Sequence, residues 1–249
     1  ENNQICYKSY ERHKAQVRQK ALDKLVELKK YTKEPFKFAI SGSGALGLCE
    51  QGELPFVQEV FASATGVSKL YSETDCAIEL GGEDAKILFF QGSVEQRMNS
   101  TCAGGTGAFI DQMSTLLNMS LEEMNEASLN YHRLYPIASR CGVFAKTDIQ
   151  PLINQGVDKC DLCASIFQAV VDQTITSLAQ GRKIEGNILF LGGPLYFMSG
   201  LRKRFVETLK LSDVQVNCPE TAINFVALGT AICADQEYTY DELYKALED

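Results

Sequence analysis

Histidine, positive charge and long apolar runs are all scarce in this sequence, and each shortage excludes a class of function. The two histidines, His13 and His132, each stand alone, so no histidine-based catalytic triad is indicated. A net charge of -8 makes a nucleic-acid backbone an unfavourable partner. No run approaches the ~20 apolar residues that a membrane helix needs, and the polar start is unlike a secretion signal. We therefore expect a cytoplasmic protein that binds neither nucleic acid nor membrane.

Cysteine, by contrast, is abundant, with nine residues. Without a secretion signal, disulfides are a poor explanation, which leaves buried packing or metal binding. Cys160 and Cys163 form a CxxC pair, but no second pair and no histidine pair completes a zinc site, so a structural role is expected. Cys76 lies within an apolar strand and receives the same interpretation.

Hydrophobic periodicity predicts a chain of mixed helices and strands. Ser120 and Glu123 have the spacing of a capping box and predict the start of one helix. Such an order fits two lobes with a ligand cleft between them better than one parallel sheet. The predicted strands span residues 36–40, 75–80, 85–90, 92–98 and 187–191, and the main predicted helices span residues 10–31, 54–66, 108–118, 142–155, 158–182, 220–234 and 240–247.

The first of three glycine-rich turns follows the strand that ends at Leu80. Gly81 and Gly82 permit positive φ angles and a close approach of the backbone. Backbone N–H groups can cradle a phosphate there, while Lys86 can neutralise it and Asp84 can hold Mg²⁺ or orient water. A plain hairpin turn with solvated charges is the alternative interpretation.

The second and third turns adjoin predicted helices. The second opens a helix whose first N–H groups lack partners and therefore attract anions; a tight junction without a ligand is the alternative. In the third, Gly192 and Gly193 precede Pro194 and let a flat ring lie against the backbone, or else allow close packing of strand on helix. The candidate binding residues of the second turn are Gly104, Gly105, Thr106 and Gly107.

The order of the three turns resembles the actin-like ATPase superfamily. Residues 81–86, 99–109 and 140–148 together resemble the BadF/BadG/BcrA/BcrD ATPase family, which includes activators of 2-hydroxyacyl-CoA dehydratases and subunits of benzoyl-CoA reductase. The resemblance runs from about Tyr10 to Ala234 and is nearest to the large activase-like members. It implies an α/β, actin-like ATPase (ribonuclease H-like) fold of two lobes that binds ATP or ADP with Mg²⁺.

The same resemblance implies an iron–sulfur centre. In that family each subunit of a homodimer contributes two cysteines to one [4Fe–4S] cluster on the twofold axis, and Cys102 and Cys141 fall on those positions. The stoichiometry is consistent, since such a cluster takes four thiolates and a twofold axis doubles two into four. Burial as small apolar side chains is the alternative for both cysteines.

The implied function is ATP-dependent one-electron transfer. A ferredoxin or flavodoxin would reduce the cluster, and the electron would pass to a partner of the 2-hydroxyacyl-CoA dehydratase or benzoyl-CoA reductase type. Two alternatives stay open: a sugar- or acetate-kinase-like enzyme of the same fold, and a non-catalytic dimerisation or cluster domain of a larger activase. Colourless protein with kinase activity would favour the former, and brown protein without ATP hydrolysis the latter.

One part of the family pattern is missing. Members begin with a strand and an Asp/Gly-rich turn that holds phosphate, and no such element precedes Tyr7. Residues 2–10 resemble the third strand of the first lobe, so the first two strands are predicted to be absent and ATP hydrolysis is left open. We expect an incomplete first lobe of residues 1–71 and 221–249, and a second lobe of residues 72–220 with the cysteines and nucleotide turns.

Overall fold

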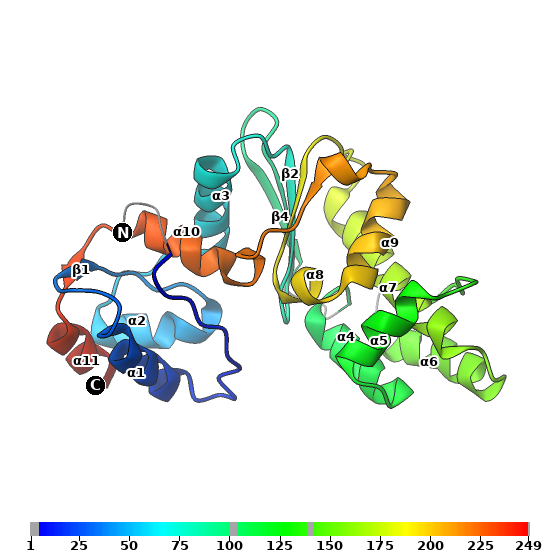
Figure 1. The fold of residues 1–249 in the computed structure, drawn as a ribbon, viewed down its shortest axis with the longest axis horizontal. Coiled ribbons are helices and arrows are strands. Elements are labelled where there is room, and N and C mark those ends of the chain that lie inside the picture. Colours follow the sequence, from blue (N-terminus) through cyan, green and yellow to red (C-terminus); the bar gives the residue numbers. More distant parts are fainter. Residues whose placement is uncertain (1–4, 100–103, 139–141, 249) are drawn as a thin grey trace. The chain divides into compact units, whose positions relative to one another are not determined.

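The computed structural model describes residues 5–99, 104–138 and 142–248. The chain divides into two compact units (Figure 1). Unit 1 contains the residues up to Ser72 and those from Ile223 onward, whereas unit 2 runs from Glu73 to Ala222. Each unit buries an apolar cluster of its own, so each is described by itself.

Unit 2 is built on a five-stranded sheet of order β4-β3-β2-β5-β6. The first three strands form an antiparallel meander, and β5 and β6 join β2 in parallel. Strands β2, β3 and β5 are buried along their whole length, which explains their nearly continuous apolar sequences. The strands are β2 (Cys76–Leu80), β3 (Ala85–Phe89), β4 (Glu95–Asn99), β5 (Ile188–Leu191) and β6 (Val216–Asn217).

Helices of unit 2 pack beside this sheet, with α7 central among them (Figure 1). Its side chains are buried over most of its length, and α5 and α9 pack against it. At α5 the predicted capping box is confirmed: Ser120 Oγ accepts from the Glu123 amide at 3.1 Å, and the Glu123 carboxylate accepts from the Ser120 amide at 2.8 Å. The helices are α4 (Gly107–Leu117), α5 (Leu121–Leu129), α6 (Gly142–Asn154), α7 (Lys159–Thr174), α8 (Gly193–Phe197) and α9 (Ser199–Leu209), with a π-helix at Ile175–Ala179 and a 3-10 turn at Asp213–Gln215.

Unit 1 is mainly helical and holds a sheet of only two short strands, β1 and β7. Helices α3 and α10 lie against each other, and a Cβ at Gly229 would come within 2.0 Å of the Ala62 carbonyl oxygen, so the backbones touch. A second cluster joins α1, α2 and α11 around Leu25 and Leu243. The elements are α1 (Val17–Leu28), β1 (Phe36–Lys37), a 3-10 turn (Ser43–Ala45), α2 (Leu46–Gly52), α3 (Glu59–Leu70), a 3-10 turn (Ala222–Asn224), α10 (Phe225–Cys233), β7 (Glu237–Tyr238) and α11 (Tyr240–Glu248).

Several predicted elements of unit 1 are wrong in extent or kind. Helix α1 is shorter than the predicted helix over residues 10–31, because Lys14 and Ala15 have positive φ angles of 47° and 62°. Residues 5–10, predicted as strand, belong to no ladder among the described residues. The predicted strand 36–40 pairs as β1 only over Phe36–Lys37, and α2 was not predicted.

One helical stretch also corrects the expectation that no run could cross a membrane. By length and composition Lys159–Ala179 is long and apolar enough to do so. However, 67% of it is buried inside the protein, which is the pattern of a core helix. It is the α7 helix continued by the π-turn, which ends where Gln180 and Gly181 adopt positive φ angles.

Candidate functional site

The first and third glycine turns lie at neighbouring strand ends. Strands β2 and β5 run parallel in register, so their carboxyl ends, followed by Gly81 and Gly192, meet at one edge of the sheet. A Cβ at Gly192 would lie 2.0 Å from the Leu80 carbonyl oxygen, and this glycine has a φ of +88°. Only glycine satisfies both conditions without strain. In open α/β sheets, ligands bind at such carboxyl edges.

The second turn joins the first through backbone hydrogen bonds. The Gly107 amide donates to the Gly81 carbonyl at 2.9 Å, and the Ala108 amide donates to the Gly82 carbonyl at 2.7 Å. A Cβ at Gly107 would lie 3.3 Å from Cγ of Pro194, in the third turn. The structure therefore brings all three predicted turns together.

This junction changes what the N-terminus of α4 can do. The amides of Gly107 and Ala108 are already satisfied by carbonyl oxygens of the first turn. A phosphate at this place would have to be bound by other groups, such as the backbone of Gly104 to Thr106 or of the Gly81–Gly82 turn. Thr106 is fully buried, and Gly105, with a φ of +85°, packs against Gln173 and Thr174 of α7. Gly82 faces open space, since a Cβ there would meet nothing within 4 Å.

The charged candidates of the first turn form a compact ionic cluster. Lys86 Nζ lies 2.7 Å from Asp84 Oδ2 and 3.2 Å from Glu79 Oε1. The side chains of Lys86 and Glu79 are only 3% and 7% exposed, whereas that of Asp84 is 25% exposed. Asp84 is thus the member of the cluster that a ligand can reach. Sequence reasoning singled out Asp84 and Lys86 but missed Glu79, although the hairpin register of β2 and β3 places Glu79 opposite Lys86.

Asp84 also explains the glycine at position 81. A Cβ at Gly81 would come within 2.1 Å of Asp84 Oδ1, so the carboxylate occupies the space that any larger residue would need. The Gly81 amide donates to the Asp84 carbonyl at 2.8 Å and closes the turn. Backbone and side chain of Asp84 therefore both hold this turn in one shape.

The two predicted cluster ligands, Cys102 and Cys141, lie outside the described residues. Within the described ranges, no group of three or more His, Cys, Asp or Glu side chains could hold a metal ion. Helix α6 begins at Gly142, immediately after Cys141 in the sequence, and α4 begins five positions after Cys102. Asp148 of α6 accepts a hydrogen bond from the Ala138 amide at 2.7 Å, which ties Ala138 to this helix.

Cysteines elsewhere in unit 2 have the environment of packing residues. Burial raises the pKa of the Cys76 thiol to about 12. It also raises the pKa of Cys163 to about 12, and the Cys163 Sγ lies 3.9 Å from the Met119 sulfur. The pKa of Cys160 is raised by burial and by its hydrogen bond to Asp158. Thiols of this kind are poor metal ligands and nucleophiles, which agrees with the structural role predicted for the CxxC pair.

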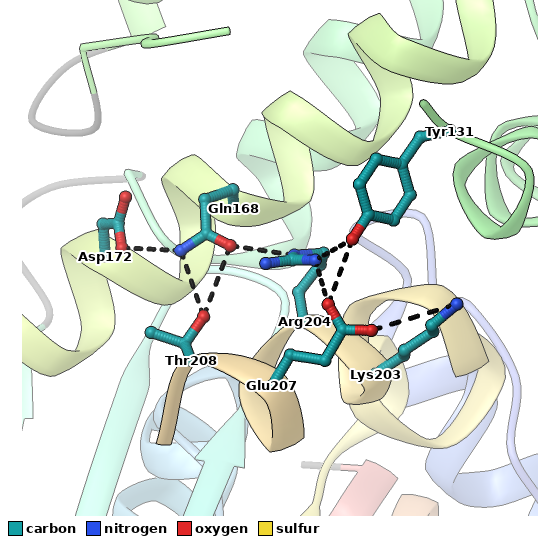
Figure 2. A network of polar contacts seen from close by, with 7 residues as sticks. All are labelled: Tyr131, Gln168, Asp172, Lys203, Arg204, Glu207 and Thr208. Atoms are coloured by element: carbon teal, nitrogen blue, oxygen red, sulfur yellow. Dashed lines mark hydrogen bonds and ion pairs between the residues drawn. The ribbon is translucent and has the colours of Figure 1, made fainter. Parts of the chain in front are cut away.

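A second polar network in unit 2 joins α7 to α9 (Figure 2). Arg204, 6% exposed, donates from Nε to the Gln168 side-chain oxygen at 2.8 Å and from Nη1 to the Tyr131 hydroxyl at 2.6 Å. It also pairs with Glu207, to which Tyr131 donates at 3.1 Å. The Arg204 guanidinium is buried and paired with a carboxylate of the same helix, so we assign it to structure.

Comparison with known proteins decides the family. A profile of the BadF/BadG/BcrA/BcrD ATPase family matches residues 6–234, which is most of the chain. The chain belongs to this family. Among family members it is 28% identical, over 87% of its length and 82% of the relative's, to "Activator of lactoyl-CoA dehydratase" from Anaerotignum propionicum. It is 26% identical, over 83% of its length and 74% of the relative's, to "2-hydroxyisocaproyl-CoA dehydratase activator" from Clostridioides difficile.

A solved structure extends the comparison to three dimensions. The chain superposes with a TM-score of 0.75 and 25% identity on "Activator of the 2-Hydroxyisocaproyl-CoA Dehydratase from Clostridium difficile with bound ADPNP". The match covers 92% of this chain and 83% of that one. The predicted actin-like ATPase fold is therefore confirmed, and relatives within the BadF/BadG/BcrA/BcrD family are dehydratase activators.

Proposed function

We propose that this protein is an ATP-dependent activator of a dehydratase of the 2-hydroxyacyl-CoA class, or of a related reductase. The observation that carries the proposal is the meeting of three glycine turns at the carboxyl edge of β2 and β5, in a member of an ATPase family. The likeness to an activator with bound ADPNP supports a nucleotide as the ligand of this edge.

In this proposal the turns share the work of binding ATP or ADP with Mg²⁺. Asp84, the exposed member of the ionic cluster, faces the Mg²⁺ or its water, and Lys86 keeps the turn that carries Asp84 in place. Gly104, Gly105 and Thr106 line the phosphate side with Gly81 and Gly82, while Gly107 anchors α4 to them. Gly192 and Gly193, which follow β5, would offer flat backbone to the adenosine.

The redox part of the proposal rests on Cys102 and Cys141 of each subunit in a homodimer. Their thiolates would hold one [4Fe–4S] cluster, which supplies one-electron transfer when bound. The N-terminal ends of α4 and α6 follow these cysteines in the sequence, and their positive dipoles would favour thiolate ligation. A ferredoxin or flavodoxin donor and a cytoplasmic location complete the proposal.

Anaerobic purification followed by iron and sulfide analysis tests the redox part. We expect a brown protein with about four iron atoms per dimer. The Cys102→Ser and Cys141→Ser variants should lose the iron, whereas Cys6→Ser, at an exposed position in unit 1, should retain it. Colourless wild-type protein prepared without oxygen, or iron retained by both variants, would contradict the proposed centre.

A second candidate follows from the small sheet of unit 1. In the described residues that sheet has two strands of two residues, so unit 1 offers little rigid support for a phosphate turn. The chain would then be a domain that holds the cluster and dimerises without hydrolysing ATP. Measured ATP turnover by the full chain separates the candidates, because only the activator hydrolyses ATP.

A further inference from the structure

Glu79 is a buried carboxylate for which the proposed function has no use. It stands on β2 directly opposite Lys86 of β3, so both side chains project from the same face of the hairpin. Its Oε1 lies 3.2 Å from Lys86 Nζ, and both residues are almost completely buried. Burying charged groups costs free energy, and an apolar pair of similar size often gives equal or greater stability. The charges at this position therefore call for a reason beyond packing.

The second contact of Lys86 supplies that reason. The same ammonium lies 2.7 Å from Asp84 Oδ2, so one cation bridges a buried carboxylate on a strand and a partly exposed carboxylate in the turn. Lysine has a long flexible stem and is a point charge without a fixed direction. If Lys86 contacted Asp84 alone, its flexible side chain would move with the turn and would not restrain it. Held also by Glu79, it ties Asp84 to the rigid strand.

The charge of the cluster points the same way. The ammonium of Lys86 contacts both carboxylates and is almost completely buried. Lys86 therefore belongs to the cluster, while Asp84, with a quarter of its side chain exposed, is the most accessible of the three. This arrangement suits a metal–nucleotide complex approached through Asp84 better than a phosphate approached through Lys86.

We propose that Glu79 is a positioning residue: through Lys86 it holds the Asp84 carboxylate above Gly81 in the orientation that binds the metal–nucleotide complex. The inference rests on the proposed nucleotide function of this turn. It adds a residue that does not touch the ligand, and it explains how Lys86 comes to orient Asp84 instead of neutralising phosphate.

Binding of Mg·ADP to the full chain, measured by calorimetric titration, tests the proposal. Outer-shell partners of this kind are worth about 10- to 100-fold in affinity, so Glu79→Gln should weaken binding by that factor. Hydrogen exchange without nucleotide gives an independent readout. We expect faster exchange in the Gly81–Ala85 turn of Glu79→Gln, with little change in α7.

The double variant Glu79→Gln/Lys86→Met separates positioning from stability. Removing both buried charges should restore most of the melting temperature lost in Glu79→Gln. Binding of Mg·ADP should stay weak, because Lys86 then no longer orients the Asp84 carboxylate. Binding restored together with stability, or turn exchange unchanged in Glu79→Gln, would overturn the inference while leaving the proposed function intact.

A matched control comes from a second ionic network of unit 2. Arg204→Met removes a buried cation that bonds to Gln168, Tyr131 and Glu207 and not to the turns, so it should lower the melting temperature without weakening the binding of Mg·ADP (Figure 2). An equal loss of affinity in this control would show that instability alone explains the Glu79 result and would overturn the inference. If the wild-type chain bound no Mg·ADP at all, the proposed function would fail, and the inference with it.

Discussion

Unit 2 and unit 1 obtain their stability in different ways. Unit 2 packs helices against a five-stranded sheet whose central strands are fully buried. In the described residues of unit 1, α1, α2 and α11 share a small apolar cluster, α3 packs closely on α10, and the sheet is two residues long. All the glycine turns of the candidate site belong to unit 2. The glycine turns, whose backbone geometry must be precise, therefore lie in the unit with the larger sheet. Four experiments test this difference between the units.

Matched glycine substitutions should give the largest effects. Gly192→Ala in unit 2 places a Cβ 2.0 Å from the Leu80 carbonyl at a positive φ angle, and Gly229→Ala in unit 1 places one 2.0 Å from the Ala62 carbonyl. We expect each to cost about 4 kcal/mol or more, because backbone must move against backbone. Only Gly192→Ala should also abolish nucleotide binding.

Hydrogen exchange resolved by segment provides the measurement for this pair. Each variant should raise exchange mainly in its own unit. Gly47→Ala is the control, since a Cβ there meets nothing within 4 Å and alanine favours the helix by about 1 kcal/mol. Equal exchange in both units of either variant would mean that the units do not unfold separately.

A cavity in the core of unit 1 should give the next largest effect. Leu243 of α11 is fully buried in the small cluster, and Leu243→Ala should cost about 2–5 kcal/mol. Because that cluster is small, we expect unit 1 to melt in a separate, earlier transition. Phe190→Ala, in the β5 strand of unit 2, should instead lower the midpoint temperature of the later transition, in which unit 2 melts. Scanning calorimetry of both variants checks this. A single shared transition would contradict separate melting of the two units.

Removing the Asp161 carboxylate of unit 2 should have a smaller effect on stability, and that effect should depend on pH. The pKa of Asp161 in unit 2 is lowered by hydrogen bonds from the backbone amides of Arg133 and His132. A lowered folded-state pKa gives stability that is present above the unfolded value, near 4, and is lost as the pH falls through the folded value. The Asp161→Asn variant should therefore be less stable than wild type at pH 7, with the difference shrinking below about pH 4. Melting temperatures measured from pH 7 to pH 3 check this, and a constant difference would contradict it.

Thiol reactivity should give the smallest perturbation, since it leaves the fold intact. Cys6 in unit 1 is exposed, whereas burial raises the pKa of both Cys76 and Cys163 in unit 2 to about 12. Iodoacetamide at pH 8 should label Cys6 in the native protein and the other two only after unfolding. Mass spectrometry of the labelled peptides gives the order in which the cysteines react. Early labelling of Cys163 would contradict its assignment to the core.

Sequence reasoning succeeded where local pattern and packing agree. Strands β2 to β5 of unit 2 were predicted within a few residues, because apolar runs that end at glycine turns are typical of buried strands. The short strand β6 was missed. Unit 1 was predicted poorly, since residues 5–10 have the composition of a strand but no partner strand in the described structure. A ladder depends on its neighbour, and one extended sequence cannot reveal whether that neighbour is present.

The candidate site was predictable only in its separate parts. Each glycine turn is visible in the sequence, yet their meeting depends on the parallel pairing of β2 with β5, which joins residues far apart in the chain. Glu79 was missed because a charged residue inside an apolar strand gives no sign of which cation will face it. Hairpin register, once the Gly81–Asp84 turn is accepted, is the signal that could have identified Lys86 as its partner.

The amide groups that open α4 have a mechanical consequence. Because they are bonded to the carbonyls of Gly81 and Gly82, the end of β2 and the start of α4 form one continuous lever rather than two parts in contact. A ligand that shifted the strand end would therefore pull on the start of α4 directly, through these two hydrogen bonds. Cys102 precedes α4 by five positions in the sequence.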